Sequence, residues 1–189
     1  MMLEEGITIK MNKMNYIQIK RIIFLILSIV VAMTIFMFSN QDGEKSKTTS
    51  KGFTKEIVDV APPTRNLEEE EKQQIVEDSQ PVIRKIAHFS IYTVFGICLF
   101  NFFKTFEWTT KKQVIFTLIL SMLYAISDEI HQFFLDGRSP LIIDIFIDTF
   151  GALFGTVIVF VIGYCLKKKK IKQWNNLLFF KGKKKNYEN

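Results

Sequence analysis

Apolar residues in this chain are concentrated in long runs separated by polar segments. The runs lie at residues 22–38, 86–103, 114–126 and 142–166, and the third continues through a more polar stretch to Gln132. Each run is close to the roughly 20 residues that cross a bilayer core of about 30 Å. A soluble chain of this length would have too little polar helix to cover four apolar helices. The pattern therefore predicts an all-α fold, a polytopic membrane bundle of four transmembrane helices.

The sign of the charged residues alternates along the chain with these runs. The formal net charge is +6. Basic residues are concentrated at 10–21, 104–112 and 167–185, whereas the segment between the first two runs is rich in acidic residues, including Glu68–Glu71. Cytoplasmic loops carry the excess of Lys and Arg. Both termini are therefore predicted to be cytoplasmic (N-in/C-in), and the loop 39–82 is predicted to be external.

These features divide the chain into three parts. Residues 1–21 form a cytoplasmic N-terminus, residues 22–166 a membrane domain, and residues 167–189 a basic cytoplasmic tail. Lys20 and Arg21 before the first apolar run imitate a signal peptide, but the run is too long and lacks a clear small-x-small cleavage site. We therefore interpret the first run as an uncleaved membrane anchor.

The basic tail alternates lysine with aromatic residues, such as Trp174 and Phe179. This pattern can bind nucleic acid. Directly after a membrane span, however, it is typical of a stop-transfer segment that contacts anionic lipid headgroups. We predict membrane lipids as partners, no nucleic acid, and a multi-pass protein of the cell membrane.

Two weakly amphipathic stretches lie in the external loop, at residues 53–60 and 67–76. Phe53, Ile57 and Val60 fall at positions i, i+4 and i+7, which would place them on one face of a helix. Such a face could rest on the outer leaflet or cap the bundle. The alternative is a flexible, solvated loop.

Polar and ionisable residues near the external ends of the spans carry the functional information. An ionisable residue inside a span costs roughly 2.5 to 3.5 kcal/mol on insertion scales, so its position is informative. Lys85, His88 and Tyr92 follow one another at helical spacing and share a face of the second span. The full set of candidate site residues is Lys85, His88, Tyr92, Asp128, Glu129, His131, Gln132, Arg138, Asp144 and Asp148.

The predicted topology places all of these residues near the external face. We expect the polar stripes to face one another, because isolated charges facing lipid are costly. Gly151 and Gly155 form a Gly-x-x-x-Gly pair that would let another helix approach the fourth span closely. The polar cluster is either a functional site or a network of hydrogen bonds and ion pairs that locks the bundle.

The same residues give the chain its resemblance to a known family. The segments Arg84–Phe89, Ser127–Gln132, Gly137-Arg138 and Asp144–Asp148, followed by Gly151 and Gly155, resemble the VanZ-like family of membrane proteins in order and spacing. The resemblance extends over residues 22–166. Asp136 stands where proline is frequent in that family, and Asp148 stands where asparagine is common. The resemblance implies a small multi-spanning protein of the bacterial cell envelope, from a family whose namesake is associated with resistance to a lipid-anchored, teicoplanin-type glycopeptide antibiotic.

Three functions are compatible with this sequence. The protein alters the access of glycopeptides or envelope lipids to the outer leaflet, or it is an intramembrane enzyme that acts on a lipid-linked envelope substrate, or it is a small proton-coupled transporter. In the enzyme, the metal-binding or acid–base groups would be His88, Asp128, Glu129, His131 and Asp144. Such His and carboxylate mixtures suit Mn, Fe or Zn, but the sequence shows no diagnostic ligand spacing, so it assigns no metal or cofactor.

The predicted topology can be tested with single cysteines in intact cells. A membrane-impermeant thiol reagent should label Thr48→Cys, which lies in the predicted external loop, and should leave Lys183→Cys in the predicted cytoplasmic tail protected. The reverse labelling pattern would overturn the N-in/C-in orientation.

Overall fold

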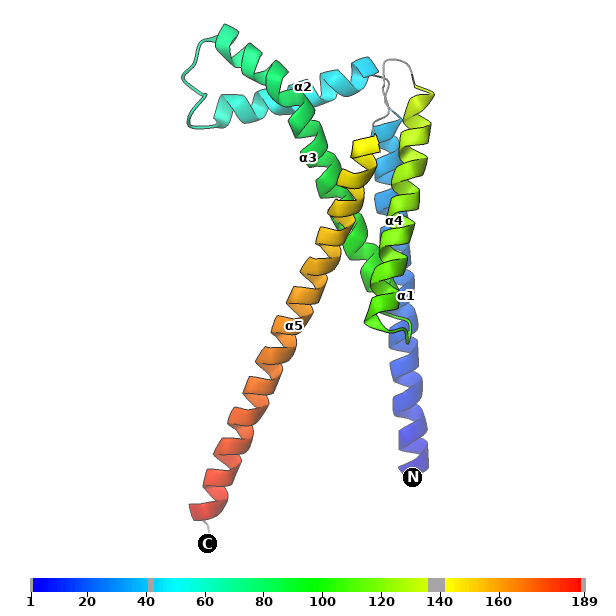
Figure 1. Cartoon of the computed structure of the whole chain (residues 1–189). Coiled ribbons are helices and arrows are strands. Elements are labelled where there is room, and N and C mark those ends of the chain that lie inside the picture. Colours follow the sequence, from blue (N-terminus) through cyan, green and yellow to red (C-terminus); the bar gives the residue numbers. More distant parts are fainter. Residues whose placement is uncertain (1, 41–42, 136–141, 188–189) are drawn as a thin grey trace. The chain divides into compact units, whose positions relative to one another are not determined.

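The computed structural model describes residues 2–40, 43–135 and 142–187, and the side chains within 14–40, 46–135 and 142–173. These residues form α1 (Met2–Ser39), α2 (Gly43–Val60), α3 (Glu69–Phe103), α4 (Thr110–Phe133) and α5 (Ile142–Tyr187), as Figure 1 shows. No strand occurs among the described residues. The helical stretches that are long and apolar enough to cross a membrane are Met14–Ser39, Glu69–Phe103, Thr110–Phe133 and Ile142–Gln173. The predicted all-α fold with four membrane-spanning helices is confirmed.

The chain divides into two compact units, Met1–Thr156 and Val157–Asn189. The first unit contains α1 to α4 and the beginning of α5. The second contains the remainder of α5, which stays helical beyond residue 166 as far as Tyr187. All the contacts described below lie within the first unit.

The core of the first unit is built around α3. Tyr92, Phe95 and Leu99 of α3 pack with Ile35 of α1 and Ala125 of α4. The Tyr124 hydroxyl of α4 also donates a 2.6 Å hydrogen bond to the Ala32 carbonyl of α1. Helix α3 is therefore the central element against which the others pack.

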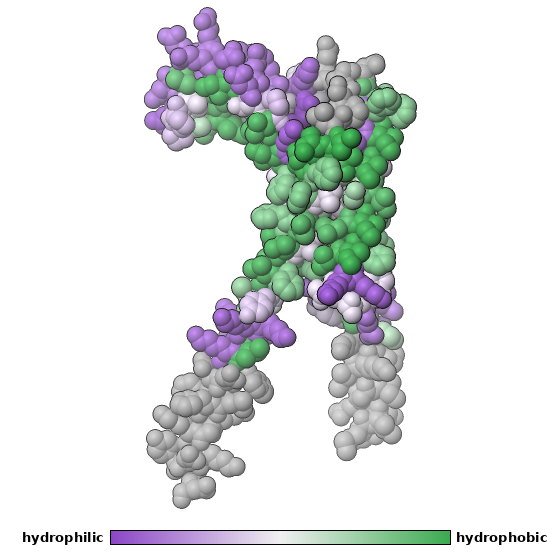
Figure 2. Space-filling model, in the orientation of Figure 1, coloured by the Kyte–Doolittle hydropathy of each residue, from purple (hydrophilic) through white to green (hydrophobic). Residues whose placement is uncertain are grey.

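Large apolar side chains cover the outer surface of these helices. Met33, Leu123 and Phe150 are 62%, 57% and 61% exposed, respectively. Figure 2 shows hydrophobic residues along the middle of the helices and hydrophilic residues over α2 and the start of α3. In water this distribution would be unfavourable, whereas in a bilayer the lipid chains cover the exposed apolar surface.

Helix α2 packs against the first turns of α3 to form a polar hairpin. Lys51 pairs with Glu77 at 3.2 Å, and Lys72 pairs with Asp59 at 3.5 Å. Val58 and Val76 are buried. The two amphipathic stretches noted in the sequence are thus helical, the first within α2 and the second largely within the start of α3.

The opposite end of α3 is fixed to α1 by one arginine. Arg21 donates hydrogen bonds of 3.1 Å to both the hydroxyl and the carbonyl oxygen of Thr105, and its guanidinium lies 4.2 Å from the centre of the Phe106 ring. These contacts join α1 to the loop between α3 and α4, at the end where the sequence places the cytoplasm.

Small residues bring α3 and α5 into direct backbone contact. A Cβ added to Gly151 would lie 2.5 Å from the Phe89 carbonyl oxygen. A Cβ on Gly155 would overlap the Thr93 carbonyl oxygen, and one on Gly96 would overlap the backbone of Ala152. No larger residue fits at these positions without moving a helix.

We predict that Gly155→Val lowers the melting temperature of the detergent-solubilised protein, because its side chain would force α3 and α5 apart. Overpacking of this kind typically costs about 1 to 3 kcal/mol, and contact with backbone favours the upper end of that range. Gly163→Val is the matched control, because a Cβ at Gly163 meets nothing within 4 Å. Equal melting temperatures for the two variants would contradict the close contact.

Candidate functional site

A histidine and an aspartate face each other across the contact between α3 and α5. Nδ1 of His88 lies 3.7 Å from Oδ1 of Asp148. The Asp148 side chain is fully buried, and that of His88 is 23% exposed. His88 directly precedes Phe89, and Asp148 lies about one turn before Gly151, so the backbone contact of Gly151 with Phe89 brings the two side chains within reach.

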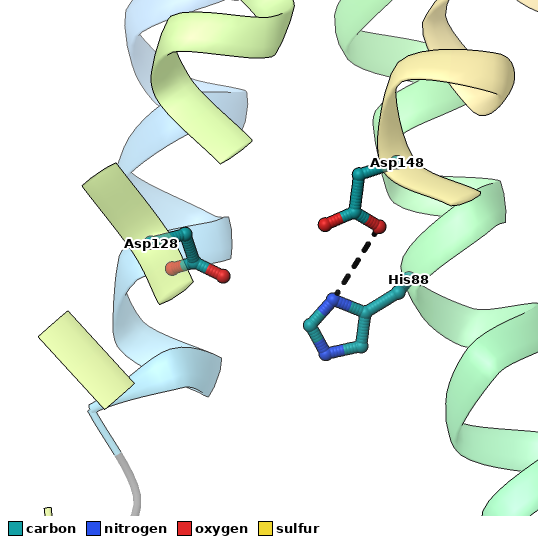
Figure 3. A group of neighbouring side chains, drawn as sticks. All are labelled: His88, Asp128 and Asp148. Carbon is teal, nitrogen blue, oxygen red and sulfur yellow. Dashed lines mark ion pairs between the residues drawn. The ribbon is translucent and has the colours of Figure 1, made fainter. Parts of the chain in front are cut away.

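Asp128 of α4 approaches the same pair from the opposite side. Figure 3 shows its carboxylate pointing toward the gap beside His88 and Asp148. One ligand atom from each of these three residues lies within 4.8 Å of the others. Gln132 donates a 2.9 Å hydrogen bond to Oδ2 of Asp128 and a 3.3 Å hydrogen bond to the Ser39 hydroxyl at the end of α1. The amide therefore fixes the orientation of the Asp128 carboxylate.

A second ion pair lies one turn closer to the start of both helices. Nζ of Lys85 lies 3.6 Å from Oδ1 of Asp144, and both side chains are partly exposed. Together with His88 and Asp148, this pair lines a small cavity of about 40 Å³. Arg84 and Pro81 are also part of its wall. The cavity is polar and large enough to hold a water molecule.

A larger, mostly apolar cavity lies on the other side of His88. Its volume is about 320 Å³. It is lined by residues of α1, α2 and α3, including Ile35, Phe53 and Ala87. Arg84 and His88 also contribute to its wall, so these two residues line both cavities.

A protein-family model described as VanZ/LLP1 matches residues 24–163 of the chain. The chain belongs to this family. The match begins in α1 and ends in α5, and it therefore contains every residue of the site described above. Searches of curated proteins and of solved structures gave no match. The membership confirms the VanZ-like resemblance, and together with the apolar helices it indicates a multi-pass membrane protein whose surface contacts lipid.

The structure of this VanZ/LLP1 protein separates the candidate residues into groups. Lys85, His88, Asp144 and Asp148 surround the small cavity, and Asp128 and Gln132 lie beside it. His131 instead turns toward α1, where its Nε2 lies 3.1 Å from Oδ1 of Asn40 and its ring is 5.0 Å from that of Phe36. The two histidines therefore have different surroundings.

The remaining candidates are buried in the bundle or lie outside the described part. Tyr92 is fully buried in the core, within electrostatic range of Asp128 and Asp148. Glu129 is also buried. Arg138 lies outside the described residues.

Arg84 is a site residue that the polar stripe of the sequence does not include. The stripe passes through Lys85, His88 and Tyr92, at steps of three and four. Arg84 is four residues before His88 and so shares its face equally well. This i, i+4 spacing is the signal that could have identified it.

Because His88 and Asp148 form a buried ion pair, we predict that the effects of their substitutions on the free energy of unfolding are not additive. His88→Ala would leave the Asp148 carboxylate buried without its ion-pair partner, a change that typically costs about 3 to 5 kcal/mol. Adding Asp148→Asn to His88→Ala should recover much of this loss, because the amide carries no charge. Unfolding in detergent with a chelator present measures both effects.

The pair Lys85 and Asp144 provides the matched control. Because these side chains are partly exposed, Lys85→Ala should lower the free energy of unfolding by less than about 1 kcal/mol. Adding Asp144→Asn to Lys85→Ala should change this value little. If His88→Ala is as mild as Lys85→Ala, the pair of His88 and Asp148 is not energetically coupled.

Proposed function

We propose that this VanZ/LLP1 protein binds a single-tailed amphiphile from the outer leaflet of the bacterial cell membrane and thereby lowers susceptibility to teicoplanin-type glycopeptides. The observation that carries the proposal is the wall shared by the apolar and the polar cavity. Arg84 and His88 line both, so a molecule with an apolar chain and a polar end can occupy the two spaces at once.

The apolar cavity would distinguish ligands by the shape of their apolar chain more than by its hydrophobicity. A lipid chain that leaves the bilayer for an apolar cavity gains little hydrophobic free energy, because both surroundings are apolar. The free energy of binding must therefore come mainly from the polar end of the molecule. This places the selectivity at the two residues shared by the cavities.

Arg84 is suited to bind an anionic group at that position. Its Nε is buried and has no hydrogen-bond partner among the described residues. A guanidinium presents donors in a planar fork that matches carboxylate and phosphate groups. An anionic or carboxylate-bearing headgroup would satisfy this donor at the point where the chain enters the cavity.

Helix α2 supports a location at the surface of the bilayer. Phe53 is 58% exposed and also lines the apolar cavity. Ile57 and Val60 of the same face are exposed as well. An apolar face of this kind can lie on the outer leaflet, with the lysines of α2 in the headgroup region. The cavity entrance would then be level with the polar ends of lipids.

A lipid-tailed glycopeptide fits this chemistry. A protein that holds the tail in its own cavity reduces the concentration of drug that reaches its target. The same cavity could hold a lipid-linked envelope molecule, and this would alter susceptibility indirectly.

A second candidate function is that of an intramembrane enzyme acting on a lipid-linked envelope substrate. The observation that favours it is the group of His88, Asp128 and Asp148 beside the apolar cavity. An imidazole ring close to two carboxylates can act as a general acid or base during hydrolysis or group transfer.

The amphiphile proposal predicts that filling the apolar cavity abolishes resistance. In cells whose teicoplanin resistance depends on this protein, Ala87→Trp should return the inhibitory concentration to that of cells without it. Arg84→Gln should have the same effect, because it removes the charged donor. Membrane levels of each variant, measured by immunoblot, must equal those of the native chain.

Ser90→Trp is the matched control for the cavity-filling variant. Ser90 is exposed on α3 less than one turn away and does not line the cavity. It should retain full resistance. The proposal is wrong if the native protein leaves the inhibitory concentration unchanged, or if Ser90→Trp and Ala87→Trp behave alike at equal membrane levels.

A further inference from the structure

The group of His88, Asp128 and Asp148 has the composition and spacing of a cation site. One atom from each residue lies within 4.8 Å of the others. In a tetrahedral site with bonds of about 2.0 to 2.2 Å, two ligand atoms lie about 3.3 to 3.6 Å apart. Side-chain shifts on the order of 1 Å would therefore bring all three atoms into coordination distance.

Two buried oxygen-bearing side chains at this place have no hydrogen-bond partner among the described residues. Asp148 is fully buried, and neither of its carboxylate oxygens accepts a hydrogen bond from the described residues. The buried Tyr92 hydroxyl, within electrostatic range of both carboxylates, also has no hydrogen-bond partner in the described part of the chain. Buried polar groups are rarely left in this state, and a bound ion with its water would supply the missing partners.

The group brings two carboxylates close together. Two carboxylates that approach each other in an apolar environment repel one another. Asp148 has no exposed surface, and Asp128 is 4% exposed. A divalent cation bound between them would offset both negative charges and bind the imidazole nitrogen at the same time.

We propose that His88, Asp128 and Asp148 bind one divalent transition-metal ion, of the class that accepts imidazole and carboxylate together, such as Zn²⁺ or Mn²⁺. Gln132 orients the Asp128 carboxylate toward this ion through its 2.9 Å hydrogen bond. The cavity of about 40 Å³ beside His88 and Asp148 leaves space for a water molecule at an open coordination position. Three protein ligands and one water are the usual set of a zinc site that carries out chemistry.

The proposed metal site does not depend on the amphiphile or on resistance. It can therefore be tested by direct metal binding to the purified full-length chain. The protein in detergent is stripped with chelator and dialysed, and then titrated with ZnCl₂ by calorimetry, with metal content measured after gel filtration. We expect saturable binding of one Zn²⁺ per chain and a rise in melting temperature with free zinc, because the ion binds the folded state.

The two histidines of the chain provide a matched pair of variants. His88→Ala should weaken Zn²⁺ binding by at least about tenfold. His131→Ala should leave binding unchanged, because His131 faces Asn40 and Phe36 instead. Asp148→Asn keeps the shape of the side chain and should also weaken binding, which keeps the test decisive if His88→Ala fails to accumulate.

The proposal is overturned by any of three results. These are the absence of saturable binding to the native chain, equal loss of binding in the His88 and His131 variants, and full binding by Asp148→Asn. If zinc binds as expected while teicoplanin resistance is absent, the metal site stands and the amphiphile proposal fails. If teicoplanin resistance is observed without zinc binding, the amphiphile proposal stands and the metal site fails.

Discussion

The close approach of α3 and α5 is the constraint on which the site depends. Gly96, Gly151 and Gly155 leave no space for side chains, so the two backbones touch over about two turns of α3. Both helices run in the same direction along this contact, and the polar residues at their beginnings come into register. His88 meets Asp148 in this way, and Lys85 meets Asp144. A residue with a Cβ at Gly151 would separate these pairs, although it takes part in none of them.

The apolar surroundings determine how the polar groups are arranged. Lipid offers no hydrogen bonds, so each charged side chain in a span must face another helix or a water-filled space. The exposure of the pairs follows their depth. Lys85 and Asp144 are partly exposed, whereas Asp148, one turn deeper, has no exposed surface. The deeper Asp148 carboxylate is therefore less solvated than the Asp144 carboxylate and depends more on an ion-pair or hydrogen-bond partner within the protein.

The two proposals assign different roles to neighbouring parts of one region. In the first proposal the apolar cavity and Arg84 would select an amphiphile, and in the second His88 would hold a metal ion together with Asp128 and Asp148. His88 lines both cavities, so an ion there would lie close to the polar end of a bound amphiphile. If both proposals hold, a metal-bound water at this place would supply a nucleophile for hydrolysis or group transfer on a lipid-linked substrate. The two activities are compatible but physically separable.

The sequence by itself determined the four spans and the residues available to the site, because span length and the cost of buried charge depend on local composition. It also indicated that Gly151 and Gly155 allow a close helix contact. Only the tertiary structure decided which polar residues meet. His131 is one turn from Asp128 on α4, yet the rotation of that helix turns His131 to Asn40 and Asp128 to His88. Such rotations depend on packing between helices distant in sequence.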